Sequence, residues 1–338
     1  MNQIRTESPL KLIADRQIVN NLLYGVVIAL IPSFAVSLWY FGLGALILTL
    51  ASVALVLTFE YVVSKYLLKK EAFMLDGAAI LTGVLLAFSL PSNLPLWILV
   101  IGAALAVGVA KIPLGKLGNP VFNSVLVSRV VLFFLFPVQM NSWPLPLVSR
   151  LQYLDAATGA TPLTLLNEGL KTGEPVAQIL GSANISYLNM FLGETGGSLG
   201  EVSAVALLIG LAYLLIKKIV TWHIPVSIAG SFVAVTGGMW YLNPNAIANP
   251  LFYLLTGGFL LGTVFMATDY FTSPKSPIGM LIFGSGIGVL AAVFCIFGVY
   301  SVGMAFAILL MNAAVPLINK YIKAENEEIE IQPNTLQS

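Results

Sequence analysis

The sequence predicts an all-α polytopic membrane protein with about ten transmembrane helices. Hydrophobic residues make up 58% of its 338 positions, charged residues make up only 9%, and the mean hydropathy is +0.92. About a quarter of the residues of an ordinary soluble domain are charged, so that class of protein is excluded. The apolar runs are long enough for helices that cross lipid, whereas the strands of a membrane barrel are only about ten residues long.

Ten apolar runs are expected to span the membrane. The run at 76–91 is short, and its boundary is poorly defined by the pattern. The first run follows Arg5, Lys11 and Arg16, but it is longer than the core of a signal peptide, so we expect it to remain as an anchor. The expected spans cover residues 20–41, 43–67, 76–91, 94–112, 121–139, 201–217, 223–242, 249–267, 278–298 and 300–319.

The distribution of basic residues predicts that both termini lie in the cytoplasm. Cytoplasmic loops of membrane proteins retain Lys and Arg. With an even number of spans, only Arg150 and Lys171 fall outside, and Arg129 falls within a span. The other basic residues all fall on the cytoplasmic side: Arg5, Lys11, Arg16, Lys65, Lys69, Lys70, Lys111, Lys116, Lys217, Lys218, Lys275, Lys320 and Lys323.

This topology divides the chain into two membrane halves, a long outer loop and a tail. Loops as long as the outer one are usually functional or disordered. Apolar residues such as Tyr153, Leu163 and Phe191 are interleaved along it, so we expect it to pack onto the membrane domain. The four parts are a first five-helix half at 1–139, an extracytoplasmic loop at 140–200, a second five-helix half at 201–322 and a polar, acidic cytoplasmic tail at 323–338.

A short internal match suggests that the two halves are repeats. The sequence ILTG at 80–83 recurs as LLTG at 254–257. Five spans in each half would make the two copies cross the membrane in opposite directions, an arrangement found in many transport folds. Two inverted five-helix repeats would place a pathway or a cofactor pocket between the halves.

Composition also limits the chemistry that the chain can supply. The net charge is +1, which gives no general attraction for nucleic acid. Cys295 is the one cysteine and His223 the one histidine, so neither a disulfide nor a multi-histidine metal site can form within the chain. We therefore expect no metal centre that belongs to this chain alone.

The outer loop contains the motif that carries chemistry, at residues 155–164 (DAATGATPLT). As residues alone it is a turn-like cluster that offers threonine hydroxyls and free backbone amides. The pattern Asp-x-x-(Ser/Thr)-Gly-Ala-(Ser/Thr) resembles the one that flavin transferases recognise when they attach FMN through its phosphate to the final hydroxyl. The resemblance makes Thr161 the acceptor, with Thr158 and Thr164 ranked below it. Gly159 and Ala160 are small enough for close approach, and Asp155 is a contact for the transferase or its metal.

Further motifs extend the resemblance over nearly the whole chain. The sequence is similar to the D subunit of the Rnf electron-transport complex, and more distantly to the B subunit of the sodium-translocating NADH:quinone oxidoreductase. The motifs, in order, are 117–123 (LGNPVFN), 136–140 (FPVQM), the attachment motif, 193–201 (GETGGSLGE) and 267–274 (ATDYFTSP).

The resemblance implies a multi-subunit oxidoreductase of the bacterial cytoplasmic membrane. Such a complex relays electrons between ferredoxin and NAD and couples them to Na⁺ or H⁺ translocation. This chain has no dinucleotide fingerprint and no cysteine cluster, so iron-sulfur and NAD chemistry would belong to partner subunits, together with a second subunit that carries covalent FMN. A flavin transferase would be needed for maturation.

Ionisable and polar residues at membrane depth are candidates for a second site. Arg129 lies mid-span and would pair with a carboxylate or with flavin or quinone oxygens. Asn123 and Asp269 are read either as helix caps or, from the resemblance, as parts of a pocket for non-covalent riboflavin nearer the cytoplasm. His223 beside Trp222 is more typical of an interfacial residue than of a proton relay.

Two other classes of function compete with the redox subunit. Ten spans and an inverted repeat would also suit a channel or transporter for a small solute or ion, although fold alone says little about function. A structural scaffold for other subunits is the third reading. The attachment motif separates them, because neither a permease nor a scaffold needs a covalent flavin.

Overall fold

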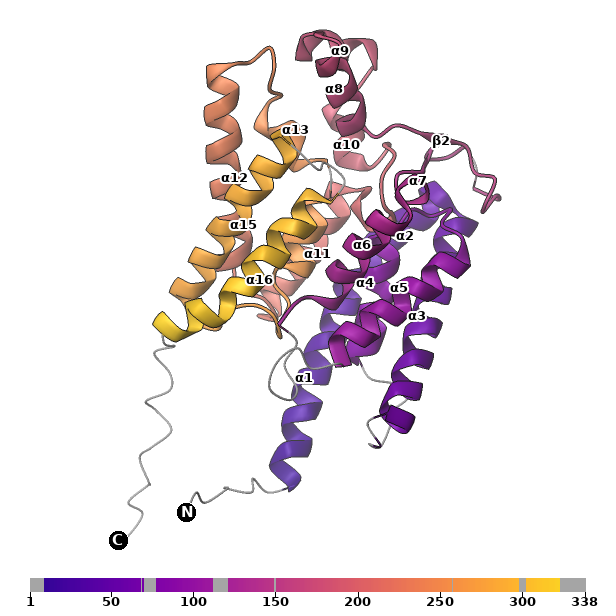
Figure 1. The fold of residues 1–338 in the computed structure, drawn as a ribbon, viewed down its shortest axis with the longest axis vertical. Helices are drawn as coiled ribbons and strands as arrows, with labels where there is room; N and C mark the ends of the chain where they lie inside the picture. Colours follow the sequence, from indigo (N-terminus) through magenta and orange to yellow (C-terminus); the bar gives the residue numbers. More distant parts are fainter. Residues whose placement is uncertain are drawn as a thin grey trace.

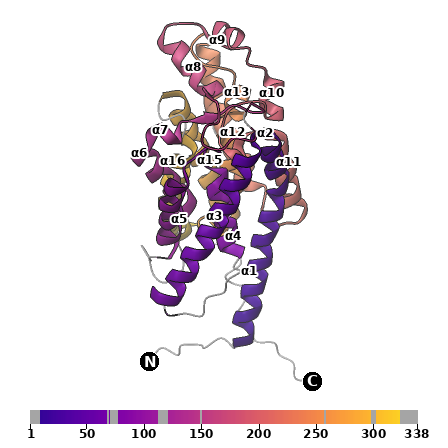
Figure 2. The same cartoon turned by 90° about the vertical axis from the view of Figure 1, so that its right-hand side faces the viewer.

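The computed structural model describes residues 9–67, 69, 77–111, 121–148, 150–256, 258–297 and 302–322. It is a helical bundle with a layer of shorter helices over one end (Figures 1 and 2). The tail at 323–338, the motif residues 117–120, and Arg5, Lys70, Lys116 and Gly257 lie outside the described residues.

The first half of the bundle contains the five expected spans as helices. The first span is not one straight helix, because a turn at Leu30, followed by Pro32, divides it, and its first part begins as early as Pro9. The elements are α1 (Pro9–Ala29), α2 (Ile31–Phe41), α3 (Leu43–Val62) continued by the π-helix η1 (Val63–Leu67), α4 (Gly77–Phe88), α5 (Leu96–Lys111) and α6 (Ser124–Leu135).

The outer loop is built from short elements. They are α7 (Pro137–Met140), β1 (Trp143–Pro144), β2 (Thr158–Gly159), α8 (Pro162–Lys171), α9 (Val176–Ser182), α10 (Tyr187–Leu192) and the 3₁₀ turn η2 (Leu199–Glu201). The two strands pair antiparallel, with Trp143 opposite Gly159.

The second half follows the expected spans with one correction. The eighth span is broken: α13 ends at Leu254, and Gly258 adopts a left-handed conformation (φ +69°) as the N-cap of the next helix. The elements are α11 (Ala204–Ile216), α12 (His223–Leu242), α13 (Pro250–Leu254), α14 (Phe259–Leu261), the π-helix η3 (Gly262–Met266), α15 (Pro277–Phe297) and α16 (Gly303–Tyr321).

Among the described residues, helix length separates two kinds of span. Five segments are long and apolar enough to cross a membrane: Val19–Phe41, Leu43–Tyr66, His223–Leu242, Pro277–Phe297 and Gly303–Tyr321. The others, such as α4 and α6 with 12 residues each, are about 18 Å long, which is less than the thickness of the lipid core. Irregular backbone at membrane depth must be covered by protein, and most of α4 is indeed buried.

Small residues allow the long helices to approach closely. A Cβ atom on Gly288 of α15 would lie 2.4 Å from the Ile228 carbonyl oxygen of α12, and Gly284 meets the same helix one turn earlier. In the first half, Gly83 of α4 packs on the α3 backbone, and Ser52 donates a 2.7 Å hydrogen bond to its carbonyl. Such contacts are the usual basis of helix association in lipid. Gly83 belongs to ILTG, but Gly257 of LLTG is not described, so the repeat stays a prediction.

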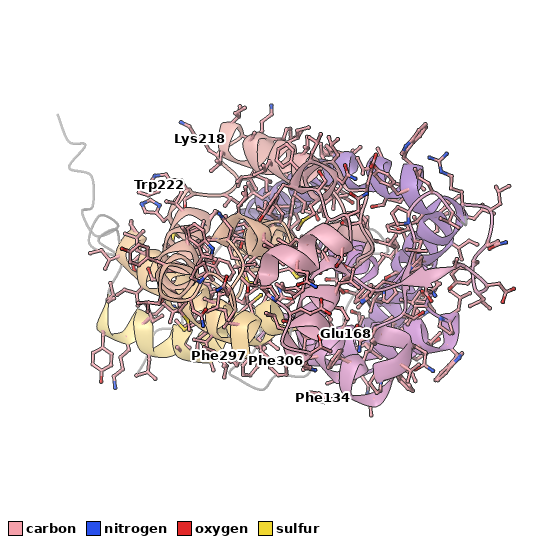
Figure 3. All side chains as sticks on the ribbon, turned by 90° about the horizontal axis from the view of Figure 1, so that it is seen from above. Phe134, Glu168, Lys218, Trp222, Phe297 and Phe306 are labelled. Atoms are coloured by element: carbon pink, nitrogen blue, oxygen red, sulfur yellow. The ribbon has the colours of Figure 1, made fainter. Side chains whose placement is uncertain are left out.

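The outside of the bundle carries the apolar side chains that lipid would contact. Seen from the end that carries the outer loop, Phe134, Phe297 and Phe306 lie along one rim, and Trp222 and Lys218 lie at another (Figure 3). Phe134 is 65% and Phe297 67% exposed. Trp222 stacks on His223 with 4.2 Å between the ring centroids, which agrees with an interfacial position for this pair.

The outer loop is fixed to the bundle by backbone hydrogen bonds, as the sequence predicts. The Leu147 amide donates to the Tyr40 carbonyl (2.9 Å), and the Leu43 amide donates to the carbonyl of Arg150 (2.8 Å). The second half is joined as well, because the Val176 amide donates to the Asn245 carbonyl (3.0 Å). The loop therefore packs onto both halves.

Tyr153 adds a side-chain attachment to the first half. Its hydroxyl donates a hydrogen bond to the Leu94 carbonyl, and burial raises the pKa of Tyr153 to about 12. The phenol therefore stays protonated, and remains a donor, throughout the physiological pH range. This contact holds the chain only a few residues before the attachment motif.

The outer loop lies at the opposite side of the bundle from the start of α1 and the end of α16. In both views α8 and α9 cover the upper end, and α1 begins at the lower end (Figures 1 and 2). The described part of α16 also ends below. The residues around Thr161 therefore lie at one side of the bundle, and the start of α1 and the end of α16 lie at the other.

Candidate functional site

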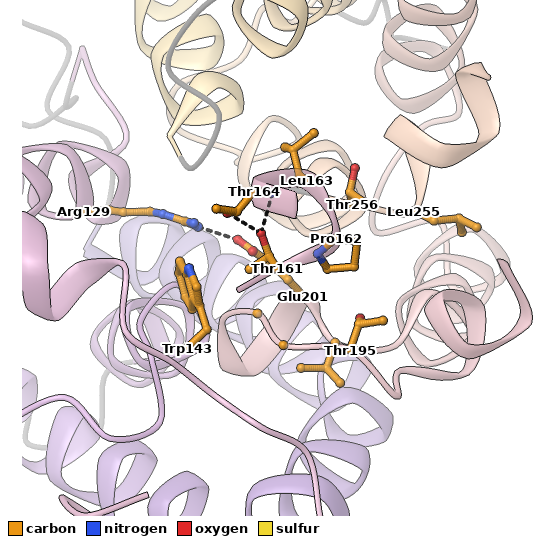
Figure 4. A pocket seen from close by; sticks show the side chains of 13 residues that line it. Arg129, Trp143, Thr161, Pro162, Leu163, Thr164, Thr195, Glu201, Leu255 and Thr256 are labelled. Atoms are coloured by element: carbon orange, nitrogen blue, oxygen red, sulfur yellow. Dashed lines mark hydrogen bonds and ion pairs between the residues drawn. The ribbon is translucent and has the colours of Figure 1, made fainter. Parts of the chain in front are cut away.

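A cavity opens where the outer loop meets the bundle. Its walls come from four places: the start of α8, the β1 strand, the turn at 195–197 with η2, and the segment before Gly258, with Arg129 of α6 at the base (Figure 4). Thr161, Trp143 and Glu201 all line it. The broken eighth span and the outer loop thus meet at one site.

Thr161 is placed at this cavity by the start of a helix. It is the N-cap of α8 and has extended backbone angles, and Pro162 occupies the first helical position, where its missing amide costs nothing. The Thr161 Oγ1 accepts a hydrogen bond from the Thr164 amide (3.2 Å) and lies 2.9 Å from the Thr164 hydroxyl. The hydroxyl is half-buried, faces the cavity wall and sits at the positive end of the α8 dipole.

The motif residues before Thr161 lead the chain to the cavity but do not line it. Thr158 and Gly159 form β2, and a Cβ on Gly159 would lie 2.6 Å from the Leu145 side chain. Asp155, Thr158 and Ala160 are exposed. The structure therefore brings the end of the motif, from Thr161 to Thr164, to the cavity and leaves these three exposed residues accessible from outside.

Arg129 forms an ion pair with Glu201. Its Nη1 lies 2.5 Å from the Glu201 Oε1, and the two side chains are only 7% and 9% exposed. Of the partners that the sequence leaves open for Arg129, the structure selects a carboxylate of the same chain. Removing two charges from water is costly, so an ion pair this buried needs good geometry and polar neighbours.

The Glu201 carboxylate lies directly against Gly258. A Cβ added at Gly258 would be 2.2 Å from Glu201 Oε1. The break in the eighth span therefore serves two purposes: it provides the left-handed turn, and it leaves room for the carboxylate. No other residue type satisfies both conditions without strain.

A second, smaller cavity is also lined in part by Arg129. Its walls come from α6, the residues around η3 and the start of α16, and they include Leu126, Met266 and Met304. Arg129 lines both cavities. The guanidinium thus forms part of the wall between an outer polar cavity and an inner apolar one.

Asn123 and Asp269, the other two candidates, serve as caps. The Asn123 side chain accepts hydrogen bonds from the Val125 and Leu126 amides (3.1 and 3.3 Å) and donates one to the Met266 carbonyl (3.3 Å). The Asn123 contact therefore ties the start of α6 to the end of η3.

Asp269 closes the turn that follows η3. Its carboxylate accepts hydrogen bonds from the Phe271 amide (3.4 Å) and the Thr272 hydroxyl (3.1 Å), and burial raises its pKa above the ordinary value. Neither Asp269 nor Asn123 lines either cavity, so the structure does not bring them together with Arg129.

The chain's relatives belong to membrane oxidoreductases. A family model described as "NQR2, RnfD, RnfE family" matches residues 7–327. The chain belongs to this family. It is 38% identical to the D subunit of the ion-translocating oxidoreductase complex of Stutzerimonas stutzeri, over 90% of this chain and 91% of the relative.

Two further family members have names that state a reaction. The chain is 35% identical to the D subunit of the proton-translocating ferredoxin:NAD(+) oxidoreductase complex of Clostridium ljungdahlii, over 90% of both chains. It is 37% identical to the Na(+)-translocating counterpart from Acetobacterium woodii, over 90% of this chain and 89% of the relative. The family and these relatives make it a membrane subunit of an Rnf-type complex, which favours the redox reading over the channel.

Sequence reasoning missed part of the cavity wall. Trp143 lies outside every motif of the sequence that points to a site. The pairing of Arg129 with Glu201 spans 72 residues, and sequence periodicity cannot show such a contact. One signal was present: the stretch at 193–201, which the family resemblance includes, supplies the turn and the carboxylate. Within the described residues no group of three or more His, Cys, Asp or Glu side chains could hold a metal ion.

Proposed function

We propose that this chain carries FMN, attached by a phosphoester bond to Thr161, and relays electrons across the membrane domain of an Rnf-type complex. The electrons pass between ferredoxin and NAD modules held by partner subunits, and their flow is coupled to Na⁺ or H⁺ translocation. Iron-sulfur subunits, a second subunit with covalent FMN and further integral membrane subunits complete the assembly.

One observation carries the proposal: the hydroxyl that the motif selects belongs to a residue that lines a cavity and caps the helix α8, whereas Thr158 does not line that cavity. Three features of the cavity suit a flavin nucleotide. A phosphate on Thr161 would sit at the N-terminus of α8, where backbone amides and the helix dipole favour negative charge. A Cβ on Gly197 would meet nothing within 4 Å, which leaves open space nearby, and the largely buried Trp143 contributes an aromatic side chain to the wall.

The attachment reaction is a phosphoryl transfer without a change in oxidation state. The Thr161 oxygen forms a bond to the phosphorus of an activated flavin nucleotide, the phosphoanhydride bond of that donor breaks, and a nucleoside monophosphate leaves. The hydroxyl proton passes to a base of the flavin transferase. The exposed residues Asp155, Thr158 and Ala160 give that enzyme a surface to recognise.

The modification can be tested on the unaltered chain. When the protein is expressed with a flavin transferase, we expect the peptide that contains Thr161 to gain the mass of one FMN molecule less one water molecule. The same peptide from a host without the transferase is the control, and should keep its unmodified mass. An unmodified peptide in the assembled native complex would contradict the proposal.

Non-covalent riboflavin is proposed for the opposite end of the bundle. Asn123 donates to the carbonyl of Met266 at the end of η3, Asp269 lies three residues after Met266, and both side chains offer polar atoms. Both side chains already make hydrogen bonds within the fold. Riboflavin would therefore bind to the donors and acceptors that these hydrogen bonds leave available. We expect denaturation of the protein to release a non-covalent flavin, and we expect that flavin to be riboflavin and not FMN.

We also propose that the Thr161 cavity faces outward and that both termini lie in the cytoplasm of a bacterium. A cysteine-free background is available through Cys295→Ser. In it, Lys171→Cys at the end of α8 should react with an impermeant thiol reagent in intact cells, and Lys275→Cys should react only after lysis. Both positions are exposed, so accessibility is matched. The reverse labelling pattern would overturn the orientation.

A further inference from the structure

We propose that the Arg129–Glu201 ion pair sets the reduction potential of the flavin held at Thr161. Arg129 provides the positive charge that favours a reduced, anionic isoalloxazine ring, and Glu201 limits that effect while it positions the guanidinium. The inference rests on the proposed function of Thr161, and it assigns a role to a pair that the attachment motif does not contain.

The first step is geometric. Arg129, Glu201 and Thr161 line one cavity, although they come from α6, η2 and the start of α8. A cofactor tethered to Thr161 cannot leave this neighbourhood, because its phosphate is fixed to the Thr161 oxygen. In Figure 4 the ion pair and the Thr161 hydroxyl face the same space. Among the described residues, Arg129 and Glu201 are the two charged residues of the cavity wall.

The second step is electrostatic. Two-electron reduction of the ring with uptake of one proton adds one negative charge, and in the titration below a chemical reductant supplies the electrons. Both side chains of the pair are less than 10% exposed, so water screens their charges poorly. A guanidinium stays protonated in proteins, so the charge of Arg129 is permanent. The potential of the flavin then depends on whether Glu201 balances that charge.

The third step is that the fold holds the pair in place. Gly258 leaves room for the carboxylate, and the Glu201 backbone belongs to a turn whose Gly200 packs against Phe88, where a Cβ would lie 2.6 Å from the ring-bearing side chain. On the other side, Arg129 is buried in α6 against the inner cavity. A pair fixed from both sides keeps a constant position relative to Thr161.

The test is a redox titration of the purified, flavin-loaded protein, followed by flavin absorbance. Glu201→Gln keeps the size of the side chain and removes the negative charge that Glu201 places beside Arg129. We expect the two-electron equilibrium to shift at least tenfold toward the reduced flavin, which corresponds to a rise of about 30 mV. Arg129→Met combined with Glu201→Gln removes both charges. The potential of this double variant should differ from the native value by less than about 30 mV.

Two further variants keep the result interpretable. Arg129→Met alone leaves the negative charge of Glu201 in the cavity wall, so it should lower the reduction potential of the flavin. If Glu201 takes up a proton, the potential should stay unchanged. A rise in the potential would overturn the proposal. It also provides an answer should Glu201→Gln fail to fold. Arg150→Met and Glu168→Gln remove charges of the outer side that do not line the cavity, and should leave the potential unchanged.

The outcomes separate this inference from the proposed function. Loss of covalent flavin fluorescence in the native chain would refute the attachment at Thr161 before any titration. Fluorescence with a native potential in Glu201→Gln, or a double variant that fails to return toward the native potential, would overturn the role of the ion pair and leave the attachment standing.

Discussion

Thr161→Ala is expected to abolish covalent flavin fluorescence on a denaturing gel, in a host that supplies a flavin transferase. Alanine has no oxygen that could form the phosphoester. Thr161→Ser keeps the nucleophile and the N-cap of α8, so it should retain the fluorescent band. Because a denaturing gel removes all non-covalent flavin, the signal reports the bond itself.

Loss of the helix cap must be separated from loss of the acceptor. Removing an N-cap costs about 1 kcal/mol, and Thr161→Ala removes both functions. Thr161→Asn supplies a side-chain oxygen that can still accept from the Thr164 amide but has no hydroxyl, so it should be as stable as the native chain and non-fluorescent. Thr158→Val and Thr164→Val should stay fluorescent. A persistent band in Thr161→Ala would mean that another residue is the acceptor.

Gly258→Ala is expected to be the most destabilising single substitution in the broken span. A left-handed conformation costs an L-residue about 1 kcal/mol or more. In addition, the new Cβ would lie 2.2 Å from the Glu201 carboxylate, which must move and weaken its contact with Arg129. Breaking a buried ion pair costs about 3–5 kcal/mol. We therefore expect a lower midpoint of thermal unfolding in detergent and a reduced yield of folded protein.

Gly173→Ala is the matched control. Gly173 has a positive φ of +84°, but its Cβ would meet nothing within 4 Å, so this variant carries only the conformational cost. The difference between the two variants measures the clash with Glu201. Equal unfolding midpoints would show that the carboxylate can move away without cost, and that the pair is not held as tightly as its burial suggests.

The sequence was a good guide to the spans because lipid imposes one simple requirement on them. Within the described residues, each expected run contains at least one helix, although several of these helices are too short to cross the lipid core. The break in the eighth run was not predicted, since periodicity and hydropathy do not register a single left-handed residue. Gly258 lies within an apolar stretch of the sequence. A glycine is needed there because the carboxylate of Glu201 lies against it, and Glu201 stands 57 residues earlier in the chain, in another element.

The candidate site was predicted in part. The attachment motif pointed to Thr161, and the structure places this residue in the wall of a cavity as the N-cap of α8. What the motif could not reveal is the rest of the cavity: Trp143 and Glu201 reach it through tertiary packing. Arg129 was conspicuous as a mid-span charge, yet only the fold chooses among its possible partners.

The hydrogen bonds that attach the outer loop to the helix ends leave little freedom around residue 161. Leu147, Arg150 and Val176 are each bonded through the backbone to one of the two halves, on both sides of the motif. A coenzyme held there would be a stationary relay and not a swinging arm. Electron exchange with the exterior would then depend on how near a partner's redox group can dock, so the rate would be governed by the assembly of the complex.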